Sequence, residues 1–340
     1  MAVKAVRTDR ELECPGIDAG LRARGVELVT LPEGIGEAEL ANAAGNADLL
    51  LTCYTPITAP VIEAATRLRG IVKYGVGIDA IDLVAARRRG IPVVNVPEYA
   101  EETVAEGAFA LLIALAKRMP AIGRAMTQDG WLWPRSEWLA SDIAGKTLGL
   151  VGTGRIGRSM ARMAGGGFRA HVLGYDPHVD RATMAAAGIE KIDDLRQMLA
   201  LADFVSIHCV LNAETRHLIG RREIDAMRPS ALLINVSRGA IIDEAELKAA
   251  LLEGRIAGAG LDVYSIEPLK LEGHPLSSLL GCDNVILFPH LTFFTHEAMR
   301  RLETDTLARC AEILEGRPVE VRSRDPRLRA QAHGVVFRDV

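Results

Sequence analysis

The stretch LGLVGTGRIG at residues 148–157 constrains the fold more than any other part of the chain. Gly152, Gly154 and Gly157 follow an apolar run directly and stand where a helix begins. In a strand–turn–helix unit with this spacing, the first glycine permits a tight turn and the second lets the backbone approach a pyrophosphate. The third lets the helix pack closely on the strand. The spacing therefore predicts a dinucleotide-binding turn with the phosphates at the helix N-terminus.

An acidic residue follows at the expected distance. The next apolar run, HVLGYDP, ends in Asp176, about 20 residues after the glycines, where the acid that binds a ribose 2′-hydroxyl is expected. Because a carboxylate there repels a 2′-phosphate, the sequence favours NAD over NADP.

Strand-like and helical segments alternate along most of the chain. Runs such as ADLLLT (47–52), GIVKYG (70–75) and ALLINVSRG (231–239) read as buried strands, and segments such as PVIEAATRL (60–68) have helical spacing. This alternation predicts an α/β protein with parallel sheets that carry helices on both faces. A length of 340 residues predicts two such domains.

Composition excludes several function classes. The formal net charge is −4, whereas nucleic-acid binders usually carry a basic excess. No apolar run is long enough for a membrane span, and the N-terminal residues lack the apolar stretch of a signal peptide. Five widely spaced cysteines predict neither a disulfide framework nor a metal site, and favour a cytoplasmic location.

Three ionisable residues stand just beyond predicted strands. Arg238 follows LLINVS, Glu267 follows GLDVYSI, and His290 follows VILFP. Ligands of open parallel sheets bind outside the carboxyl ends of the strands, so we expect the three to converge near the cofactor. An arginine fork suits a carboxylate with its neighbouring carbonyl oxygen, a histidine moves one proton near neutral pH, and a glutamate orients it. With a hydride source, this set predicts reduction of a 2-oxo acid.

Six motifs make the chain resemble the D-isomer-specific 2-hydroxyacid dehydrogenase family from about residue 45 to 320. They are VKYGVGIDAIDLVAARRRGIPVVNVP, GKTLGLVGTGRIG, LGYDP, LLINVSRGAIIDEAELKAAL, GAGLDVYSIEP and NVILFPHLTFFTHEA.

The resemblance implies a flavodoxin-like substrate domain with an inserted Rossmann NAD-binding domain, an active site in the cleft between them, and a homodimer. The expected substrate domain comprises 1–101 and 296–322, the NAD-binding domain 102–295, and a C-terminal tail 323–340, which we expect to be an extended or partly disordered arm.

The resemblance also assigns roles to individual residues. Arg238, Glu267 and His290 are the expected catalytic residues, and Gly75, Val76, Gly77 and Arg238 the expected substrate contacts. Lys73 is added to the substrate contacts because it stands just before the loop at 75–77. The expected cofactor contacts are Thr103, Gly152, Gly154, Arg155, Ile156, Gly157, Asp176, His208, Val210, Val236, Ser237, Asp262 and His290.

Some positions depart from the family pattern or leave two interpretations open. Val210 stands where the family usually has proline, and Phe293 with Phe294 stands where many members have small residues. These rings either narrow the substrate pocket or pack into the domain core. Lys73 either reaches a second anionic group or is a rim charge. Trp138 resembles an interface tryptophan of some glyoxylate and hydroxypyruvate reductases.

The predicted function is NAD-dependent interconversion of a 2-oxo acid and a D-2-hydroxy acid. The alternative is a dinucleotide-sensing, non-enzymatic binder on the same fold, similar to transcriptional corepressors. The sequence leaves the particular acid open, from small oxo acids to 3-phosphorylated hydroxy acids and bulkier ones.

Overall fold

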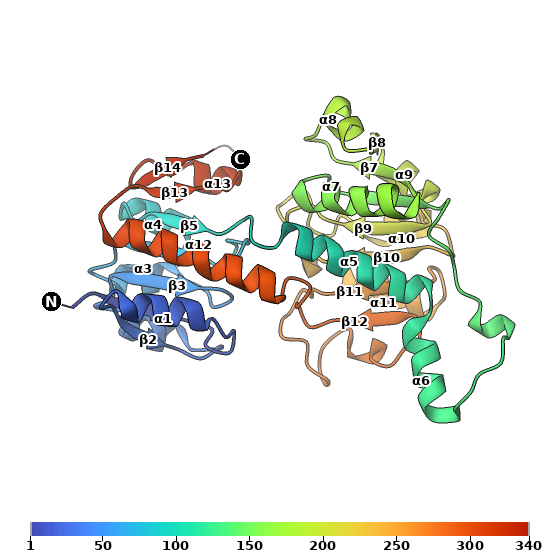
Figure 1. The fold of residues 1–340 in the computed structure, drawn as a ribbon, viewed down its shortest axis with the longest axis horizontal. Helices are drawn as coiled ribbons and strands as arrows, with labels where there is room; N and C mark the ends of the chain where they lie inside the picture. Colours follow the sequence, from blue (N-terminus) through green and yellow to red (C-terminus); the bar gives the residue numbers. More distant parts are fainter. Residues whose placement is uncertain (1, 339–340) are drawn as a thin grey trace. The chain divides into compact units, whose positions relative to one another are not determined.

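The computed structural model describes residues 2–338, and the chain forms two compact units (Figure 1). One unit combines the residues up to Ala100 with those from Thr295 onward, and the other is Glu101–Phe294. We describe each unit by itself.

The first unit is built on a five-stranded parallel sheet. Its strands are β1 (Lys4–Arg7), β2 (Glu27–Thr30), β3 (Leu49–Thr52), β4 (Gly70–Lys73) and β5 (Val93–Asn95), in the order β2-β1-β3-β4-β5. This is the flavodoxin-like order. Helix α1 (Pro15–Ala23) packs against α12 (His296–Leu314), while α2 (Glu37–Ala44), α3 (Ala59–Ala64) and α4 (Leu83–Arg88) pack in sequence on one another.

The second unit is built on a seven-stranded parallel sheet. Its strands are β6 (Thr147–Val151), β7 (His171–Tyr175), β8 (Glu190–Lys191), β9 (Phe204–Ile207), β10 (Leu232–Asn235), β11 (Gly258–Leu261) and β12 (Val285–Leu287). Their order is β12-β11-β10-β9-β6-β7-β8, which is the Rossmann order with one further strand. The predicted fold class, two doubly wound α/β units of these two types, is confirmed.

Helices complete the second unit. They are α5 (Glu101–Ala116), α6 (Met119–Asp129), α7 (Arg155–Ala161), α8 (Arg181–Ala186), α9 (Leu195–Leu201), α10 (Arg221–Ala226) and α11 (Glu244–Leu252), with a π-helical turn at Arg162–Gly167. Two apolar clusters fill this unit. One includes Leu112 and Met160, the other Leu199 and Leu247, and all four side chains are fully buried. Burying each such side chain stabilises the fold by roughly 1.5–3 kcal/mol.

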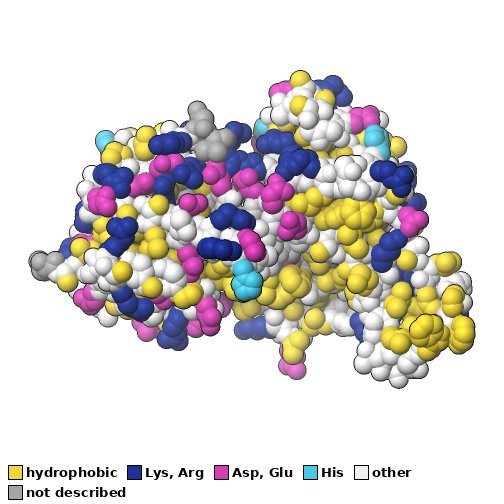
Figure 2. Space-filling model, viewed as in Figure 1, with side chains coloured by type: hydrophobic (Ala, Val, Ile, Leu, Met, Phe, Trp, Pro, Cys, Tyr) yellow, Lys and Arg dark blue, Asp and Glu magenta, His cyan; other side chains and the backbone are white. Residues whose placement is uncertain are grey.

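The segment after α6 is irregular, as the three tryptophans, Pro134 and Gly145 predict. It contains a single 3-10 turn at Ser136–Trp138, and Trp131 and Trp133 are 72% and 71% exposed. In the view of Figure 2, apolar side chains gather where α6 and this segment lie in Figure 1. Trp138 itself is half-buried.

The expectation that the C-terminal tail is an extended or disordered arm was wrong. Strand β13 (Val319–Val321) pairs in parallel with β14 (Val335–Phe337), and α13 (Pro326–Arg329) lies between them in sequence. Val319, Val321 and Leu328 are fully buried, so weak periodicity concealed a small folded element. Residues 339–340, which the prediction also covered, lie outside the described residues.

Across residues 2–338, none of the helices is at once long and apolar enough to cross a membrane.

Candidate active site

The glycine-rich turn lies between β6 and α7, beside the point where the strand order of the second unit reverses. Gly152 has a φ of 94°, and a Cβ on it would lie 2.5 Å from the backbone nitrogen of Cys209. A Cβ on Gly157 would lie 2.4 Å from the carbonyl oxygen of Gly152, whereas a Cβ on Gly154 would meet no atom within 4 Å. Gly152 and Gly157 are therefore required by the turn itself. Gly154 leaves open space at the head of α7, which fits a bound pyrophosphate.

Asp176 stands at the end of β7 beside this turn. Its carboxylate accepts hydrogen bonds from the N–H of Thr153 at 2.9 Å and from the N–H of His178 at 3.0 Å. The carboxylate is therefore held in place, half-buried, next to the glycine turn, where a ribose hydroxyl would need it.

The other expected cofactor contacts belong to the same unit. Arg155 and Ile156 form the first turn of α7, and Arg155 is ion-paired with Glu101 at 2.6 Å. Thr103 is buried in the first turn of α5. Val236 and Ser237 directly follow β10, and Ser237 donates a hydrogen bond to the carbonyl of Cys209.

Two of them lie in the segment that follows β9. Val210 is exposed, and the ring of His208 contacts the hydroxyl of Ser206 at 2.9 Å through Nε2. Burial lowers the pKa of His208 to about 4, so its ring is neutral at physiological pH. Its buried Nδ1 has no hydrogen-bond partner among residues 2–338.

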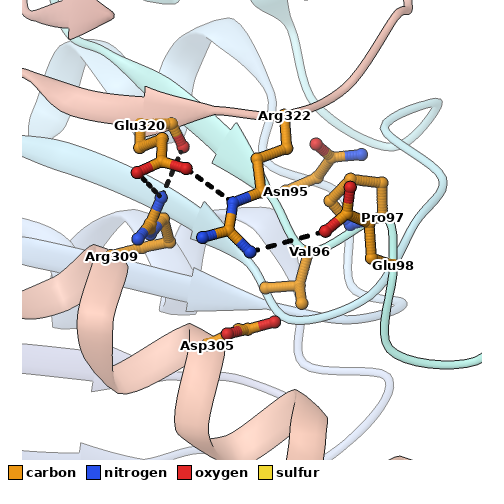
Figure 3. Close-up of a pocket in the computed structure, with 8 residues that line it drawn as sticks. All are labelled: Asn95, Val96, Pro97, Glu98, Asp305, Arg309, Glu320 and Arg322. Atoms are coloured by element: carbon orange, nitrogen blue, oxygen red, sulfur yellow. Dashed lines mark hydrogen bonds and ion pairs between the residues drawn. The ribbon is translucent and has the colours of Figure 1, made fainter. Parts of the chain in front are cut away.

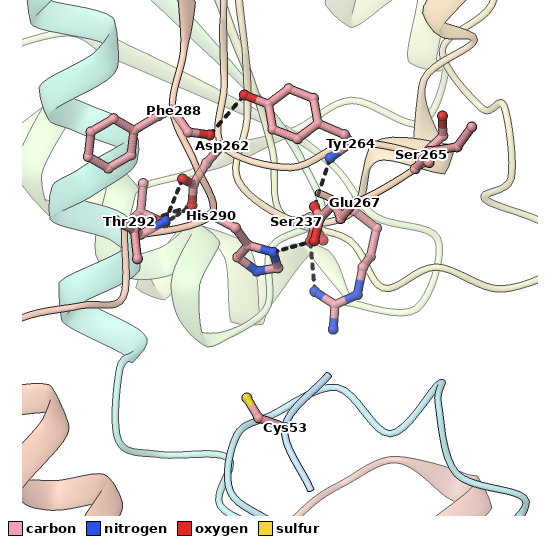
Figure 4. A network of polar contacts seen from close by, with 12 residues as sticks. Cys53, Ser237, Asp262, Tyr264, Ser265, Glu267, Phe288, His290 and Thr292 are labelled. Carbon is pink, nitrogen blue, oxygen red and sulfur yellow. Dashed lines mark hydrogen bonds and ion pairs between the residues drawn. The ribbon is translucent and has the colours of Figure 1, made fainter. Parts of the chain in front are cut away.

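Arg238, Glu267 and His290 are brought together at the carboxyl ends of β10, β11 and β12. The Glu267 carboxylate contacts His290 Nδ1 at 2.8 Å and accepts a hydrogen bond from the N–H of Tyr264 at 2.9 Å. Figure 4 shows the imidazole of His290 and the backbone of Tyr264 both directed at this carboxylate. The expectation that the three residues converge agrees with this geometry.

The electrostatics of the pair favour a charged carboxylate. Burial is the largest single effect and raises the pKa of the Glu267 carboxyl, but the hydrogen bond and charge of His290 act against it, and the net pKa is lowered. The N–H of Tyr264 and the charge of Arg238 act in the same direction. An ionised Glu267 therefore faces His290 Nδ1 at neutral pH.

A second carboxylate holds the loop that carries His290. Asp262, fully buried at the end of β11, accepts hydrogen bonds from the N–H groups of Leu291 and Thr292 at 2.9 and 3.1 Å, and from the Thr292 hydroxyl. Burial raises the pKa of Asp262 despite these bonds. His290 has a φ of 55°, a left-handed conformation that non-glycine residues rarely adopt, so this anchoring maintains a strained backbone beside the imidazole.

Three residues of this site were missed by sequence reasoning. Tyr264 binds Glu267 through its N–H and the carbonyl of Phe288 through its hydroxyl, at 2.8 Å. Glu244, at the start of α11, accepts the N–H of Ser265 at 2.6 Å. A Cβ on Gly239 would lie 1.9 Å from the backbone of Tyr264. Only Gly239 left a sequence signal, because a glycine beside an arginine that is expected to bind substrate suggests a close backbone approach.

The two phenylalanines after His290 differ in burial. Phe293 is buried and packs edge-on against the His290 ring, with centroids 6.3 Å apart, and against Phe294 at 5.9 Å. Phe294 is exposed. Phe293 therefore packs into its own unit, and its ring lies against one side of the His290 ring.

Lys73 and the loop after it form a second candidate site, in the first unit. Of the two interpretations of Lys73, burial contradicts the rim charge, because the residue is only 7% exposed. Its ammonium donates to the carbonyl of Cys53 and lies 5.6 Å from the Tyr54 ring centre. A Cβ on Gly75 would lie 3.4 Å from Lys73 Nζ, so the positive charge lies directly beneath the loop. Among the described residues, no carboxylate forms an ion pair with it.

In the loop at 75–77, hydrogen bonds hold the backbone carbonyls of Gly75 and Val76. The carbonyl of Gly75 accepts the N–H of Val96 at 3.1 Å, and that of Val76 accepts the side-chain amide of Asn95 at 2.6 Å. The N–H of Gly75 is bonded to the carbonyl of Lys73. Within the described part of the chain, the N–H groups of Val76 and Gly77 have no acceptor, so they are available to an anion above the buried ammonium.

Asp9 is a further residue that sequence reasoning missed. It follows β1 at the point where the strand order of the first unit reverses, with a φ of 56°. Its buried carboxylate accepts the N–H groups of Cys53, Tyr54 and Thr55 at 2.8–3.0 Å, and the hydroxyls of Thr8 and Thr55. Burial raises the pKa of Asp9, but these hydrogen bonds together lower it by more, so the net pKa is lowered. Asp9 thereby fixes the turn whose Cys53 carbonyl holds Lys73.

Comparison with known proteins agrees with this geometry. A family model described as D-isomer specific 2-hydroxyacid dehydrogenase, NAD binding domain, matches residues 109–292. A glyoxylate reductase of Korarchaeum cryptofilum is 42% identical over 258 residues, which is 75% of this chain and 76% of that protein. The chain belongs to the D-isomer specific 2-hydroxyacid dehydrogenase family.

Two further relatives differ in length and name. A D-3-phosphoglycerate dehydrogenase of Methanocaldococcus jannaschii is 37% identical over 87% of this chain, and the chain spans 54%, about half, of that protein's length. A D-lactate dehydrogenase of Aquifex aeolicus, solved with NAD and lactic acid, superposes with a TM-score of 0.81 at 28% identity, covering 92% of this chain and 96% of that one.

Proposed function

We propose that this chain is an NAD-dependent dehydrogenase that interconverts a 2-oxo acid and a D-2-hydroxy acid. The observation that carries the proposal is the 2.8 Å pair of His290 and Glu267 beside Arg238, in the same unit as the glycine turn and Asp176. Membership of the family supports it, and so do the names of the relatives.

In this proposal His290 is the acid and base. For reduction, the imidazolium donates its Nε2 proton to the oxygen that becomes the hydroxyl, while Glu267 holds Nδ1 and stabilises the charged ring. Arg238 binds the carbonyl oxygen and a carboxylate oxygen with its two-pronged guanidinium. A bound nicotinamide cofactor supplies or takes the hydride.

The residues that would hold the cofactor fit a dinucleotide. The open space at Gly154 and the N-terminus of α7 suit its pyrophosphate, and the anchored Asp176 suits an unphosphorylated ribose. We propose that Thr103, Arg155, Ile156, His208, Val210, Val236, Ser237 and Asp262 complete the contacts. We also assign the second unit as the cofactor-binding domain and the first as the substrate domain.

We propose that the loop Gly75–Gly77 binds the substrate carboxylate. Its support is the pair of unengaged N–H groups at Val76 and Gly77, together with the Lys73 ammonium buried beneath them. A homodimer is also part of the proposal, supported by the exposed apolar side chains of α6 and the tryptophan segment. A reducing, cytoplasmic setting is supported by five cysteines that all remain free thiols.

Oxidation of NADH in the presence of glyoxylate, hydroxypyruvate, pyruvate or a 3-phosphorylated oxo acid tests this function. We expect saturable turnover with at least one of them. The loss of NADH absorbance measures this turnover. Tight NADH binding without turnover over a wide oxo-acid panel would instead identify the non-enzymatic, dinucleotide-sensing alternative.

Replacing Asp176 with alanine should erode the preference for NADH over NADPH. The charge that repels a 2′-phosphate and the acceptor for a ribose hydroxyl are both lost, and a charge-assisted hydrogen bond contributes roughly 1.5–3 kcal/mol, so we expect the ratio of kcat/KM values to fall by about 10-fold or more. The ratio is the proper readout, because losing the bonds to Thr153 and His178 loosens the turn for both cofactors.

The matched control is Asp193→Ala, which removes an exposed carboxylate of the same unit that pairs with Arg181. This control should leave the ratio unchanged. An unchanged ratio in Asp176→Ala would show that this carboxylate does not read the ribose.

A further inference from the structure

The folded C-terminal segment, residues 317–338, makes contact with the part of the first unit that carries the loop at 75–79. Three attachments reach this region from the segment, through Gln331, Arg327 and Arg322. Gln331 contacts the edge strand β5, and Arg327 contacts the loop after β4. Arg322 contacts the residues that follow β5.

The first attachment completes the edge of the five-stranded sheet. Gln331 accepts the N–H of Val93 at 2.7 Å through its side-chain oxygen and donates to the carbonyl of Val93 at 2.9 Å. Since β5 is the last strand of the sheet, the side-chain amide takes the place of a neighbouring strand's peptide group. Gly334 packs against Pro92 just before it, where a Cβ would lie 3.3 Å from the proline ring.

Hydrogen bonds connect strand β5, which Gln331 holds, to the loop at 75–77. Asn95, the last residue of β5, donates to the carbonyl of Val76 at 2.6 Å, and the next N–H, of Val96, binds the carbonyl of Gly75 at 3.1 Å. The position of β5 therefore sets the position of both anchored carbonyls. Each of these carbonyls belongs to the same planar peptide group as the N–H of the next residue, so together they set the directions of the N–H groups of Val76 and Gly77.

The second attachment reaches the loop directly. Arg327, in α13, is ion-paired with Asp79 at 3.0 Å, and Asp325 pairs with the same guanidinium at 2.7 Å. Hydrogen bonds and charges of these two carboxylates raise the pKa of Arg327. Asp79 is two residues beyond Gly77, so this pair restrains the far end of the loop.

The third attachment is a charged cluster at the other end of β5. Figure 3 shows Arg322 between Glu320 and Glu98, with Arg309 on the opposite side of Glu320. The Arg322–Glu320 and Arg322–Glu98 distances are 2.6 and 3.4 Å, and Arg309 pairs with Glu320 at 3.6 Å. Arg309 and Glu320 are both buried. This cluster ties β13 to α12 and to the residues directly after β5.

We propose that the C-terminal segment is a positioning element for substrate binding, in which Gln331 acts through β5 and Asn95, and Arg327 acts through Asp79, on the loop Gly75–Gly77. The inference rests on the proposed role of this loop in binding the carboxylate of an oxo acid. Gln331 and Arg327 touch neither substrate nor cofactor, so their loss weakens oxo-acid binding and leaves cofactor binding intact.

The test uses the full chain and the variants Gln331→Leu, Arg327→Gln and Asp79→Asn. Leucine keeps the bulk of Gln331 but removes both hydrogen bonds to Val93, and we expect the KM for the oxo acid to rise about fivefold. The exposed Arg327–Asp79 pair should change KM only about twofold. Adding Asp79→Asn to Arg327→Gln should raise KM no further, because Arg327→Gln already removes the contact that the two residues share. In all variants kcat and the Kd for NADH should stay within twofold.

Two matched controls separate positioning from general destabilisation. His333→Ala changes an exposed residue two positions from Gln331, and Arg317→Gln removes an exposed pair with Glu315. Both should leave KM unchanged. Hydrogen exchange at the amides of Gly75 and Val96, which are hydrogen-bonded to the carbonyls of Lys73 and Gly75, supplies a readout independent of turnover. It should become faster in Gln331→Leu but not in His333→Ala.

The outcomes separate this inference from the proposed function. If the wild-type chain turns over an oxo acid but Gln331→Leu keeps both its KM and its exchange rates, the positioning role is overturned. Parallel losses in kcat, NADH binding and KM would also overturn it, because they indicate a general loss of structure. If the wild-type chain turns over no oxo acid, the proposed function fails, and the exchange rates alone decide whether the segment positions the loop.

Discussion

Replacing His290 with glutamine is expected to lower kcat for oxo-acid reduction by about 10³-fold, within the 10²- to 10⁴-fold range typical of a lost general acid. Glutamine keeps a hydrogen-bonding group that can reach Glu267, so the loop should remain in place, but it donates no proton to the developing alkoxide. The Kd for NADH should change little, because the glycine turn and Asp176 are untouched.

Stopped-flow measurement of a single turnover separates the chemical step from cofactor binding in this variant. The matched control is His296→Gln, which changes an exposed histidine at the start of α12, six residues further on. This control should retain wild-type turnover. If His290→Gln kept kcat within about threefold of wild type at neutral pH, another group would have to supply the proton.

The fold was predictable from the sequence because its signals are local. Apolar runs such as those at Leu49–Thr52 and Leu232–Asn235 are buried strands in the structure, and parallel strands buried on both faces require such runs. Strand β1, Lys4–Arg7, was not predicted. Only Ala5 and Val6 are apolar there, and Arg7 is buried through its pairing with Asp18 rather than through its own hydrophobicity.

The proposed catalytic residues could be picked out because each follows a recognisable strand, but the residues that support them could not. The position of Glu267 depends on the N–H of Tyr264, and the position of His290 depends on Asp262 through Leu291 and Thr292. These are contacts between backbone groups and side chains, and no residue pattern encodes them. The resemblance indicated Asp262 only as a cofactor contact, and the structure shows that its carboxylate also holds the loop that carries His290.

Charged residues were the least predictable, because burial depends on tertiary partners. Lys73 and Asp9 look like surface residues in sequence, yet both are buried at the carboxyl ends of strands of the first unit. The C-terminal segment shows the same effect on a larger scale. Its arginines suggested a solvated arm, but Arg322, Arg327 and Arg329 make ion pairs or backbone contacts within the first unit.

Replacing Arg238 with lysine should lower kcat/KM for the oxo acid by about 100-fold. The charge is retained, but lysine offers a single point donor where the guanidinium offers two parallel N–H groups that match a carboxylate oxygen and the adjacent carbonyl. Each charge-assisted hydrogen bond contributes roughly 1.5–3 kcal/mol, so the loss of one accounts for a factor of this size. The loss should appear in both kcat and KM, because the carbonyl contact strengthens as negative charge develops on the oxygen.

Arg221→Lys is the matched control for this change, because Arg221 is an exposed arginine of the same unit that pairs with Asp225. It should retain wild-type kcat/KM. Arg238→Lys should also retain the wild-type Kd for NADH, which fluorescence titration measures directly. A variant that lost NADH binding would place Arg238 on the cofactor, and one that kept kcat/KM within about threefold would remove it from the substrate. A selective loss of kcat/KM assigns the guanidinium to the reacting oxo acid, beside the His290–Glu267 pair whose charge it already influences.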